Sequence, residues 1–205
     1  MERRGLRAPR IRRGLTTTEV PGLLLTGGAS SRMGVPKATL LVEGEPIAAR
    51  LARLLARVCT PALEVGPGYS DLRTVEEARP GMGPLAALVA GADAVGGSGP
   101  VLLIACDLPF VGEALLSRLV TWPGTGTIVP VDREGMMQPV CARYSHDAIR
   151  RAREQLADGE RSLRAVLDDV DVTRVDDVDE RELVDVDTPE DARRWGIGPP
   201  GSLGP

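Results

Sequence analysis

The chain is poor in several residue types on which common protein chemistries depend. Its 205 residues include no asparagine, a single lysine (Lys37), a single histidine (His146) and three cysteines. The cysteines, Cys59, Cys106 and Cys141, lie far apart and show no CxxC spacing, which argues against a zinc site or a disulfide framework. Because free thiols are typical of a reducing compartment, we expect a cytoplasmic protein.

The shortage of histidine also limits the kinds of catalysis that the chain can support. A nucleophilic cysteine normally needs a histidine as its base. His146 opens a predicted surface helix, and Cys106 fits better as a small apolar residue of a buried strand. The sequence therefore argues against thiol catalysis.

Length and charge exclude further classes of protein. The balance of 29 acidic against 25 basic residues gives a net charge of -4, which argues against nucleic acid as the main partner. No apolar run approaches the roughly 18 to 20 residues that a membrane span requires. The length suits one domain, which we expect at residues 19–197.

Both ends of the chain have the composition of tails. Residues 1–18 begin with six arginines among the first fifteen positions and contain no secretory signal, so we expect a flexible basic tail, with a nucleic-acid-binding arm as the alternative. Residues 198–205 are rich in glycine and proline, and we expect them to be disordered.

Between the tails, short apolar runs alternate with longer amphipathic ones. The pattern predicts strands within 20–28, 62–66, 100–110, 126–131 and 137–144, and helices within 46–59, 83–95, 113–120, 146–159 and 161–170. Such alternation is typical of an α/β fold with three layers, in which helices cover both faces of a mostly parallel sheet.

In sheets of this kind, ligands bind outside the carboxyl ends of the strands. Three polar segments look like strand exits: TGGASSRMGVPK at 26–37, CDLP at 106–109 and VDVDTPED at 184–191. We therefore expect the functional site to be built from these segments.

The first segment has the features of a phosphate-binding loop. Gly27, Gly28 and Gly34 allow backbone N–H groups to face an anion, and Arg32 and Lys37 add positive charge. The spacing is neither that of a P-loop nor that of a dinucleotide fingerprint. A lysine kept in a chain that otherwise uses only arginine indicates a place that accepts a compact ammonium and rejects a planar guanidinium. The alternative is a tight turn between strand and helix.

The second segment offers a metal ligand. Asp107 directly follows the apolar run VLLIA and precedes Leu-Pro. Mg²⁺ needs only one or two protein carboxylates, because water and phosphate oxygens complete its octahedron. The alternative is a solvated aspartate in a turn.

The third segment carries two aspartates just before a predicted helix. Asp185 and Asp187 lie on the same side of an extended segment and are candidates for the ligand cleft. Pro189 suits the first turn of a helix, and Thr188 with Asp191 has the spacing of a capping box. Helix capping is thus the alternative role for Asp187.

The string LLLTGGASSRMGVPKATLLVEG resembles the signature loop LAGGxSxRMGxxKxxL of the nucleotidyltransferases typified by molybdenum cofactor guanylyltransferase. Thr26 stands where that pattern has alanine. The resemblance extends through GMGPLAAL, ACDLPF, QPVCARY and LVDVDTPEDARRW, and it covers roughly residues 20–195.

This resemblance implies a Rossmann-like nucleotidyltransferase fold and roles for particular residues. The segment Leu25–Gly28 would approach the nucleotide, Arg32 and Lys37 would act on its phosphates, and Asp107 would bind Mg²⁺. Asp187 would be a further metal ligand, on the side of the pterin. Glu77, where the family usually has aspartate, would contact the guanine.

The implied reaction is the transfer of GMP from GTP to the terminal phosphate of molybdopterin, which forms the guanine dinucleotide cofactor and pyrophosphate. A phosphate monoester with a second pKa of about 6 is already mostly dianionic at neutral pH, so no general base is required. Besides GTP and molybdopterin, molybdoenzyme maturation proteins are possible partners.

Three other functions remain open. The chain could transfer CMP to molybdopterin, act on another phosphorylated small molecule, or bind nucleotide without catalysis as an adaptor. The basic segment at Arg161, Ser162 and Arg164 is a candidate for pterin binding, and a surface helix start explains it equally well.

Overall fold

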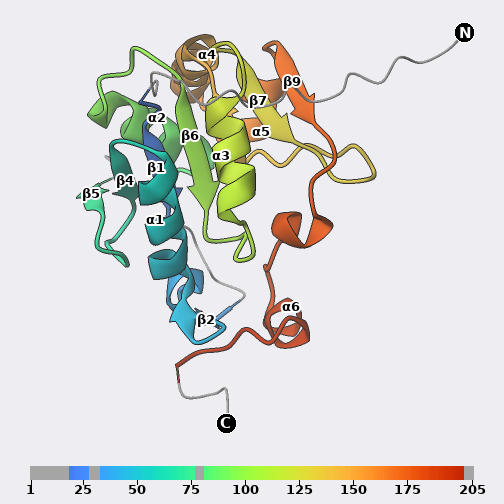
Figure 1. Ribbon diagram of the computed structural model, residues 1–205. Helices are drawn as coiled ribbons and strands as arrows, with labels where there is room; N and C mark the ends of the chain where they lie inside the picture. Colours follow the sequence, from blue (N-terminus) through green and yellow to red (C-terminus); the bar gives the residue numbers. More distant parts are fainter. Residues whose placement is uncertain (1–18, 28–32, 77–80, 201–205) are drawn as a thin grey trace, which may run out of the picture.

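The structure is a computed structural model that describes residues 19–27, 33–76 and 81–200 (Figure 1). Its centre is a seven-stranded sheet in the order β5-β4-β1-β6-β8-β7-β9. The strands are β1 (Gly22–Leu25), β4 (Ala62–Val65), β5 (Arg73–Val75), β6 (Val101–Ala105), β7 (Thr127–Pro130), β8 (Cys141–Tyr144) and β9 (Val172–Val175). A separate hairpin pairs β2 (Leu41–Val42) with β3 (Glu45–Pro46).

Helices cover both faces of this sheet. They are α1 (Ile47–Val58), α2 (Pro84–Ala94), α3 (Glu113–Thr121), α4 (His146–Ala157), α5 (Leu163–Asp168) and α6 (Pro189–Arg194), with the short 3₁₀ helices η1 (Lys37–Thr39) and η2 (Glu180–Leu183). Side chains that alternate along the strands enter two different cores. Leu24, Leu102 and Ile104 pack with α1 and α3, whereas Leu23 and Leu103 pack with α2, α4 and α5. The predicted three-layer α/β arrangement is confirmed.

The sheet is mostly parallel, as the alternation of strands and helices predicts. β1 pairs in parallel with β4 and β6, and β4 pairs in parallel with β5. β8 runs antiparallel to both β6 and β7, and β9 is parallel to β7. The carboxyl ends of β1, β4 and β6 consequently meet at one edge of the sheet.

Close packing of α2 on this part of the sheet depends on a glycine. A Cβ atom at Gly91 would lie 2.7 Å from the side chain of Leu23 and 2.9 Å from that of Val65. Gly91 therefore lets α2 approach β1 and β4 closely, and this brings the beginning of α2 to the edge where those strands end.

Some elements were absent from the prediction. The strands β5 and β9 have three and four residues, and most of their side chains are exposed, so they lack the apolar run on which the prediction relied. The segment at 184–187 is not a strand exit, because it follows η2 and is itself extended without strand pairing. It reaches the sheet edge through a backbone hydrogen bond of 3.0 Å from the Val186 N–H to the Asp107 carbonyl.

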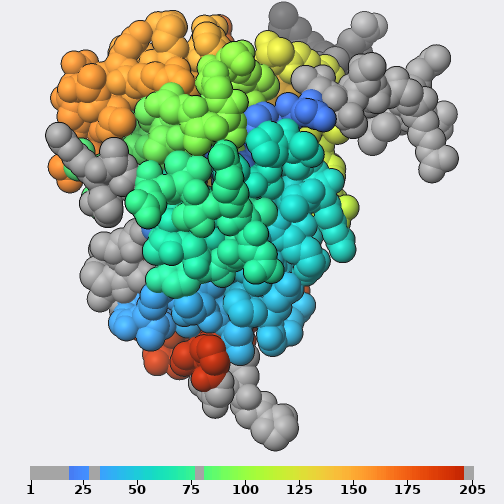
Figure 2. Space-filling model, turned by 90° about the vertical axis from the view of Figure 1, so that its left-hand side faces the viewer, coloured from blue at the N-terminus to red at the C-terminus, as the bar shows by residue number. Residues whose placement is uncertain are grey.

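Gly198, which the composition placed in a disordered tail, is paired with another part of the chain. Gly198 and Leu41 form an isolated antiparallel bridge, in which the Leu41 N–H donates to the Gly198 carbonyl at 2.8 Å. Figure 2 shows this C-terminal segment in red, against the blue segment that includes η1 and the hairpin. Gly198 thus pairs with the free edge of β2 in the hairpin, although the composition of its segment predicted disorder. Residues 1–18 and 201–205 lie outside the described part of the chain.

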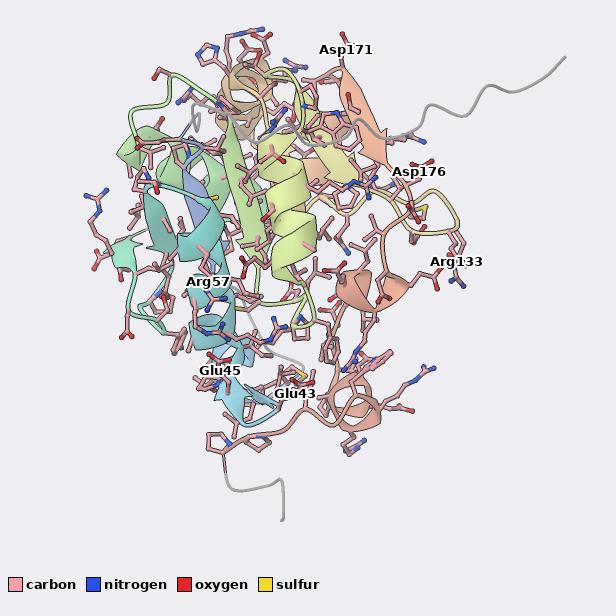
Figure 3. The ribbon with its side chains drawn as sticks, in the orientation of Figure 1. Glu43, Glu45, Arg57, Arg133, Asp171 and Asp176 are labelled. Atoms are coloured by element: carbon pink, nitrogen blue, oxygen red, sulfur yellow. The ribbon has the colours of Figure 1, made fainter. Side chains whose placement is uncertain are left out.

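Most charged side chains, such as those of Glu43, Arg133 and Asp171, lie on the outside of the three layers, whereas Glu64 and Arg143 are buried (Figure 3). Many form pairs at the surface, such as Arg57 with Glu113 at 2.9 Å. Exposed pairs of this kind contribute little to stability. Among the described residues, no helix combines the length and apolar character that crossing a bilayer requires.

Candidate active site at the strand ends

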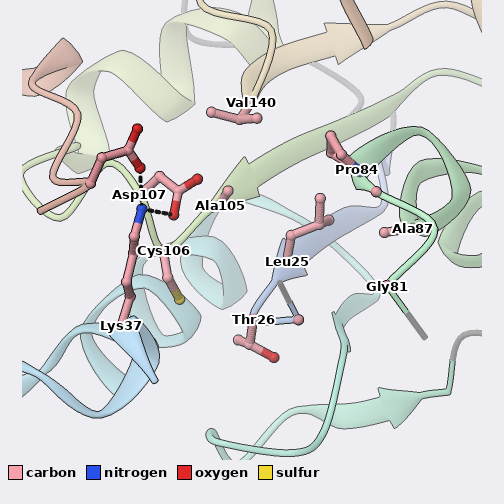
Figure 4. Close-up of a pocket in the computed structure, with 13 residues that line it drawn as sticks. Leu25, Thr26, Lys37, Gly81, Pro84, Ala87, Ala105, Cys106, Asp107 and Val140 are labelled. Atoms are coloured by element: carbon pink, nitrogen blue, oxygen red, sulfur yellow. Dashed lines mark hydrogen bonds and ion pairs between the residues drawn. The ribbon is translucent and has the colours of Figure 1, made fainter. Parts of the chain in front are cut away.

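A cleft of about 250 Å³ opens where β1 and β6 end (Figure 4). Its walls come from the end of β1, the end of β6 and the start of α2. The lining residues are Leu25, Thr26, Gly27, Lys37, Gly81, Gly83, Pro84, Ala87, Ala105, Cys106, Asp107, Val140 and Asp187. Five of the predicted site residues, Leu25, Thr26, Gly27, Lys37 and Asp107, thus share one cavity with a sixth, Asp187.

Lys37 is the first residue of η1, and its side chain reaches across the cleft to two carboxylates. Its Nζ atom lies 2.8 Å from Asp107 Oδ1 and is also in contact with Asp187 Oδ1 (Figure 4). The side chain of Lys37 is only 12% exposed, whereas those of its two partners are 40% and 51% exposed. The ammonium of Lys37 therefore lies deeper in the protein than the two carboxylates that it contacts.

The environment keeps this ammonium protonated. Burial by itself lowers the pKa of Lys37, but hydrogen bonds and charge from Asp107, and then from Asp187, outweigh burial and raise the pKa above its usual value. The side chain consequently presents a fixed positive charge to the cleft at physiological pH.

Asp107, Asp185 and Asp187 form a cluster of acids. Each offers one carboxylate oxygen, and these atoms lie within 4.8 Å of one another. Loss of hydration, together with the negative charges of Asp187 and Asp107, raises the pKa of Asp185 to about 6. Like charges this close repel, and a cation placed among them relieves the repulsion. Oxygen ligands of this type suit Mg²⁺.

The capping interactions leave Asp187 free of the structural role that its sequence position suggests. Thr188 is the N-cap of α6, and the Thr188 hydroxyl accepts from the Asp191 N–H while the Asp191 side chain accepts from the Thr188 N–H. The capping box thus forms without Asp187. The Asp187 carboxylate is turned instead toward Lys37.

The compact geometry around Lys37 leads to a prediction for Lys37→Arg. The planar guanidinium is wider than an ammonium, and the site holds Lys37 against two carboxylates in a nearly buried position. We expect this variant to transfer nucleotide at least about tenfold more slowly than the unchanged protein, as measured by pyrophosphate release. A rate close to that of the unchanged protein would show that the positive charge at this position matters and that the shape of the cationic group does not.

Cys106 lines the cleft, but its thiol is not suited to nucleophilic attack. Burial, followed by the negative charges of Asp107 and Glu64, raises the pKa of Cys106 far above its usual value. The thiol therefore stays protonated, in agreement with the sequence-based argument against thiol catalysis.

Three predicted site residues, Gly28, Arg32 and Glu77, lie outside the described residues. Of the candidates for pterin binding, Ser162 is the N-cap of α5, as the alternative explanation required. The carbonyl of Arg161 accepts a hydrogen bond of 3.4 Å from the Leu85 N–H at the start of α2.

Sequence reasoning missed Glu64. This residue lies in β4, and its side chain is fully buried behind Thr26, whose hydroxyl donates to it. A single acid within the apolar run ALEV was the available signal, because an unpaired buried carboxylate is costly and normally indicates a specific hydrogen-bonding role.

The comparison with known domains agrees with this geometry. The model of the family described as "MobA-like NTP transferase domain" matches residues 22–176, which contain the β1 exit, Lys37 and Asp107. The chain belongs to this family. The MobA-like NTP transferases are nucleotidyltransferases, so the cleft at the strand ends is the active-site candidate of an enzyme of that class.

Individual MobA-like relatives cover most of the chain. A protein of Chloroflexus aggregans named "Probable molybdenum cofactor guanylyltransferase" is 30% identical in an alignment that covers 84% of this chain and 91% of the relative. The crystal structure of molybdopterin-guanine dinucleotide biosynthesis protein A from Archaeoglobus fulgidus superposes with a TM-score of 0.71 at 18% identity, and the match covers 86% of this chain and 96% of that one.

The same fold is found in an enzyme whose name gives a different base and a different acceptor. The 2-C-methyl-D-erythritol 4-phosphate cytidylyltransferase of Thermus thermophilus superposes with a TM-score of 0.64 at 18% identity, over 87% of this chain and 97% of that one. The fold therefore supports nucleotidyl transfer in general and does not select the base or the acceptor.

Proposed function

We propose that this protein transfers GMP from GTP to the terminal phosphate of molybdopterin and releases pyrophosphate. The observation that carries the proposal is the meeting of Lys37 Nζ and Asp107 Oδ1, 2.8 Å apart, in the cleft where β1 and β6 end. A cationic group for phosphates and a carboxylate for a metal are thus within reach of one bound triphosphate. The name of the Chloroflexus relative supports guanine and molybdopterin as the substrates.

Mg²⁺ is the proposed cofactor, with Asp107 and Asp187 as its ligands and Asp185 beside them. The three carboxylates fit this ion, because they supply only oxygen donors and carry more negative charge than Lys37 neutralises. When bound, Mg²⁺ would neutralise phosphate charge and orient the triphosphate.

Lys37 contacts Asp107 and Asp187 in the structure, and in the proposed complex it would also contact phosphate oxygens. With nucleotide present, the phosphates would compete with Asp107 and Asp187 for the ammonium, and the released carboxylates would become available to the metal. Leu25, Thr26 and Gly27 would bind the nucleoside, and Arg32 and Lys37 would act on the phosphates. Gly28 and Glu77 keep their predicted roles in nucleotide and guanine binding as part of this proposal.

The chain would not need to supply a general base, because the attacking group is already a phosphate dianion at neutral pH. The protein would hold this nucleophile in line with the α-phosphate and stabilise the charge that develops there. No side chain would need to accept a proton from the nucleophile. We place this reaction in the cytoplasm, as the unpaired cysteines predict.

The deciding experiment measures pyrophosphate release with GTP and with CTP, each with and without molybdopterin, at fixed Mg²⁺. We expect release that depends on molybdopterin, with kcat/KM for GTP at least about tenfold above that for CTP, the scale of discrimination when a base-specific hydrogen bond is lost. A preference for CTP would instead identify a cytidylyltransferase. Release with neither nucleotide, although nucleotide binds, would support the adaptor function, with delivery to molybdoenzyme maturation proteins as its purpose.

A further inference from the structure

Glu64 is the hub of a hydrogen-bond network directly behind the nucleotide side of the cleft. Its Oε1 atom accepts from the Thr26 hydroxyl, from the Gly68 N–H at 2.9 Å and from the Tyr69 N–H at 2.7 Å. Its Oε2 atom accepts from the Ser70 N–H at 2.8 Å and from the Ser70 hydroxyl at 2.6 Å. One carboxylate thus joins the end of β1 to the loop that follows β4.

This carboxylate is both buried and ionised. The Glu64 side chain has no exposed surface, and burial alone would raise its pKa, but hydrogen bonds from Ser70, Thr26 and the Tyr69 backbone outweigh burial and lower the pKa. Within the described part of the chain, every hydrogen-bond donor to Glu64 is a neutral hydroxyl or amide. An anion that can only accept hydrogen bonds fixes the direction of all five donors.

The network holds two backbones in contact. The Thr26 N–H donates to the Val65 carbonyl at 3.1 Å, which continues the pairing of β1 with β4. At Gly66, with φ +147°, a Cβ atom would lie 2.3 Å from Thr26 Oγ1 and 2.7 Å from the Gly27 nitrogen. Gly66 therefore allows the loop to press directly against Thr26 and Gly27, and Glu64 holds it there.

The residues that this network holds also form part of the wall of the cleft. Leu25, Thr26 and Gly27 line the cleft, while the hydroxyl of Thr26 is directed away from the cleft to Glu64. In the family pattern an alanine stands at the position of Thr26, and alanine has no hydroxyl to form this link. This chain therefore fixes the wall of its cleft through a contact that the signature motif does not provide.

We propose that Glu64 is a positioning residue, which acts through Thr26 and the loop at 66–70 to hold the Leu25–Gly27 wall in the shape that binds the nucleoside of the substrate. The inference rests on the proposed function, because it assumes that this wall contacts nucleotide. Glu64 itself would touch neither substrate nor metal, so it should influence nucleotide affinity and leave the chemical step nearly unchanged.

The test compares Glu64→Gln with Thr26→Val. The amide of glutamine places an N–H group against backbone N–H donors that need an acceptor, and valine removes one donor while keeping the shape of threonine. We expect Kd for GTP and KM for GTP to rise by about tenfold in Glu64→Gln and by about three- to tenfold in Thr26→Val, while kcat at saturating GTP changes by less than about twofold. A fall in kcat without a change in KM would overturn the proposal.

Thr127→Val is a matched control. Thr127 is buried on β7, and its hydroxyl donates a hydrogen bond to the Ser145 hydroxyl at 2.9 Å, on the other half of the sheet. We expect its loss to lower the unfolding midpoint to a similar extent as Thr26→Val, with Kd for GTP unchanged. If Thr127→Val weakens GTP binding as much as Thr26→Val does, general destabilisation explains the effect and the proposal is wrong.

A double-mutant cycle shows whether Glu64 acts through Thr26. If it does, the variant with both substitutions should bind GTP about as weakly as Glu64→Gln alone, whereas multiplied effects would contradict the link. Should Glu64→Gln not fold, Ser70→Ala decides the question, because it removes a donor to Glu64 at a residue that does not line the cleft: Kd for GTP should still rise, and an unchanged Kd would contradict the proposal. Nucleotide binding by the unchanged protein separates the two levels of inference: no GTP binding there refutes the proposed function, and GTP binding that neither variant alters refutes only the role of Glu64.

Discussion

Replacing Lys37 with alanine is expected to lower the rate of pyrophosphate release by about a hundredfold or more at saturating GTP. The ammonium is nearly buried, is held in the protonated form and lies at the point where phosphates would meet the metal-binding carboxylates. Removing one preorganised group that stabilises developing charge typically costs about 10²- to 10³-fold in turnover. The loss should appear mainly in kcat, because the charge matters most when the α-phosphate is attacked.

Arg57→Ala provides the comparison for this variant. Arg57 on α1 is an exposed cation that pairs with Glu113 on α3, away from the cleft. Removing it changes the net charge by the same amount as Lys37→Ala without altering the site. We expect its rate to match that of the unchanged protein. A Lys37→Ala enzyme that also retains a nearly normal rate would remove Lys37 from the catalytic machinery.

Replacing Asp107 with asparagine is the second change with a large expected effect. The amide keeps the size of the side chain and one oxygen ligand but removes the charge that Lys37 contacts and that Mg²⁺ would contact in the proposed complex. We expect turnover to fall by about a hundredfold at low Mg²⁺, and the Mg²⁺ concentration for half-maximal activity to rise by about tenfold or more. Partial recovery at high Mg²⁺ would distinguish weakened metal binding from general damage to the site.

Asp171→Asn is the matched control for the second change. Asp171 is an exposed aspartate beside β9, at the opposite edge of the sheet from β5 (Figure 3). Its substitution should leave both turnover and the Mg²⁺ requirement as they are. An Asp107→Asn enzyme with an unchanged Mg²⁺ requirement would show that this carboxylate does not bind the metal.

Local signals in the sequence were sufficient for most of the architecture. The buried runs at β1 and β6 and the amphipathic pattern of α1 predict strands and helix, because burial on one or both faces imposes a period on the chain. The capping box of α6 was predicted from four consecutive residues, because the hydrogen bonds of a helix cap form within one turn of the chain. The short strands β5 and β9 escaped prediction because most of their side chains are exposed, so no apolar run marks them in the sequence.

The residues of the candidate site also differ in whether the sequence alone could identify them. Lys37 and Asp107 were candidates from the sequence, because a lone lysine follows a glycine-rich loop and an acid follows an apolar strand, and the resemblance to the family motifs favoured their roles over the alternatives. The role of Glu64 was not visible, because its partner Thr26 is 38 positions away and meets it only when β1 and β4 pair. The alternative that Asp187 caps a helix was likewise resolved by geometry, which turns its carboxylate toward Lys37.

By itself the sequence determined the layers of the fold, the strand ends at which a ligand would bind and the chemical types of the groups placed there. Only the tertiary structure decided which of these groups meet, because contacts between residues 70 or 150 positions apart arise from strand order and helix packing. It also decided that Gly198 pairs with Leu41, since this pairing depends on an edge that another part of the chain supplies.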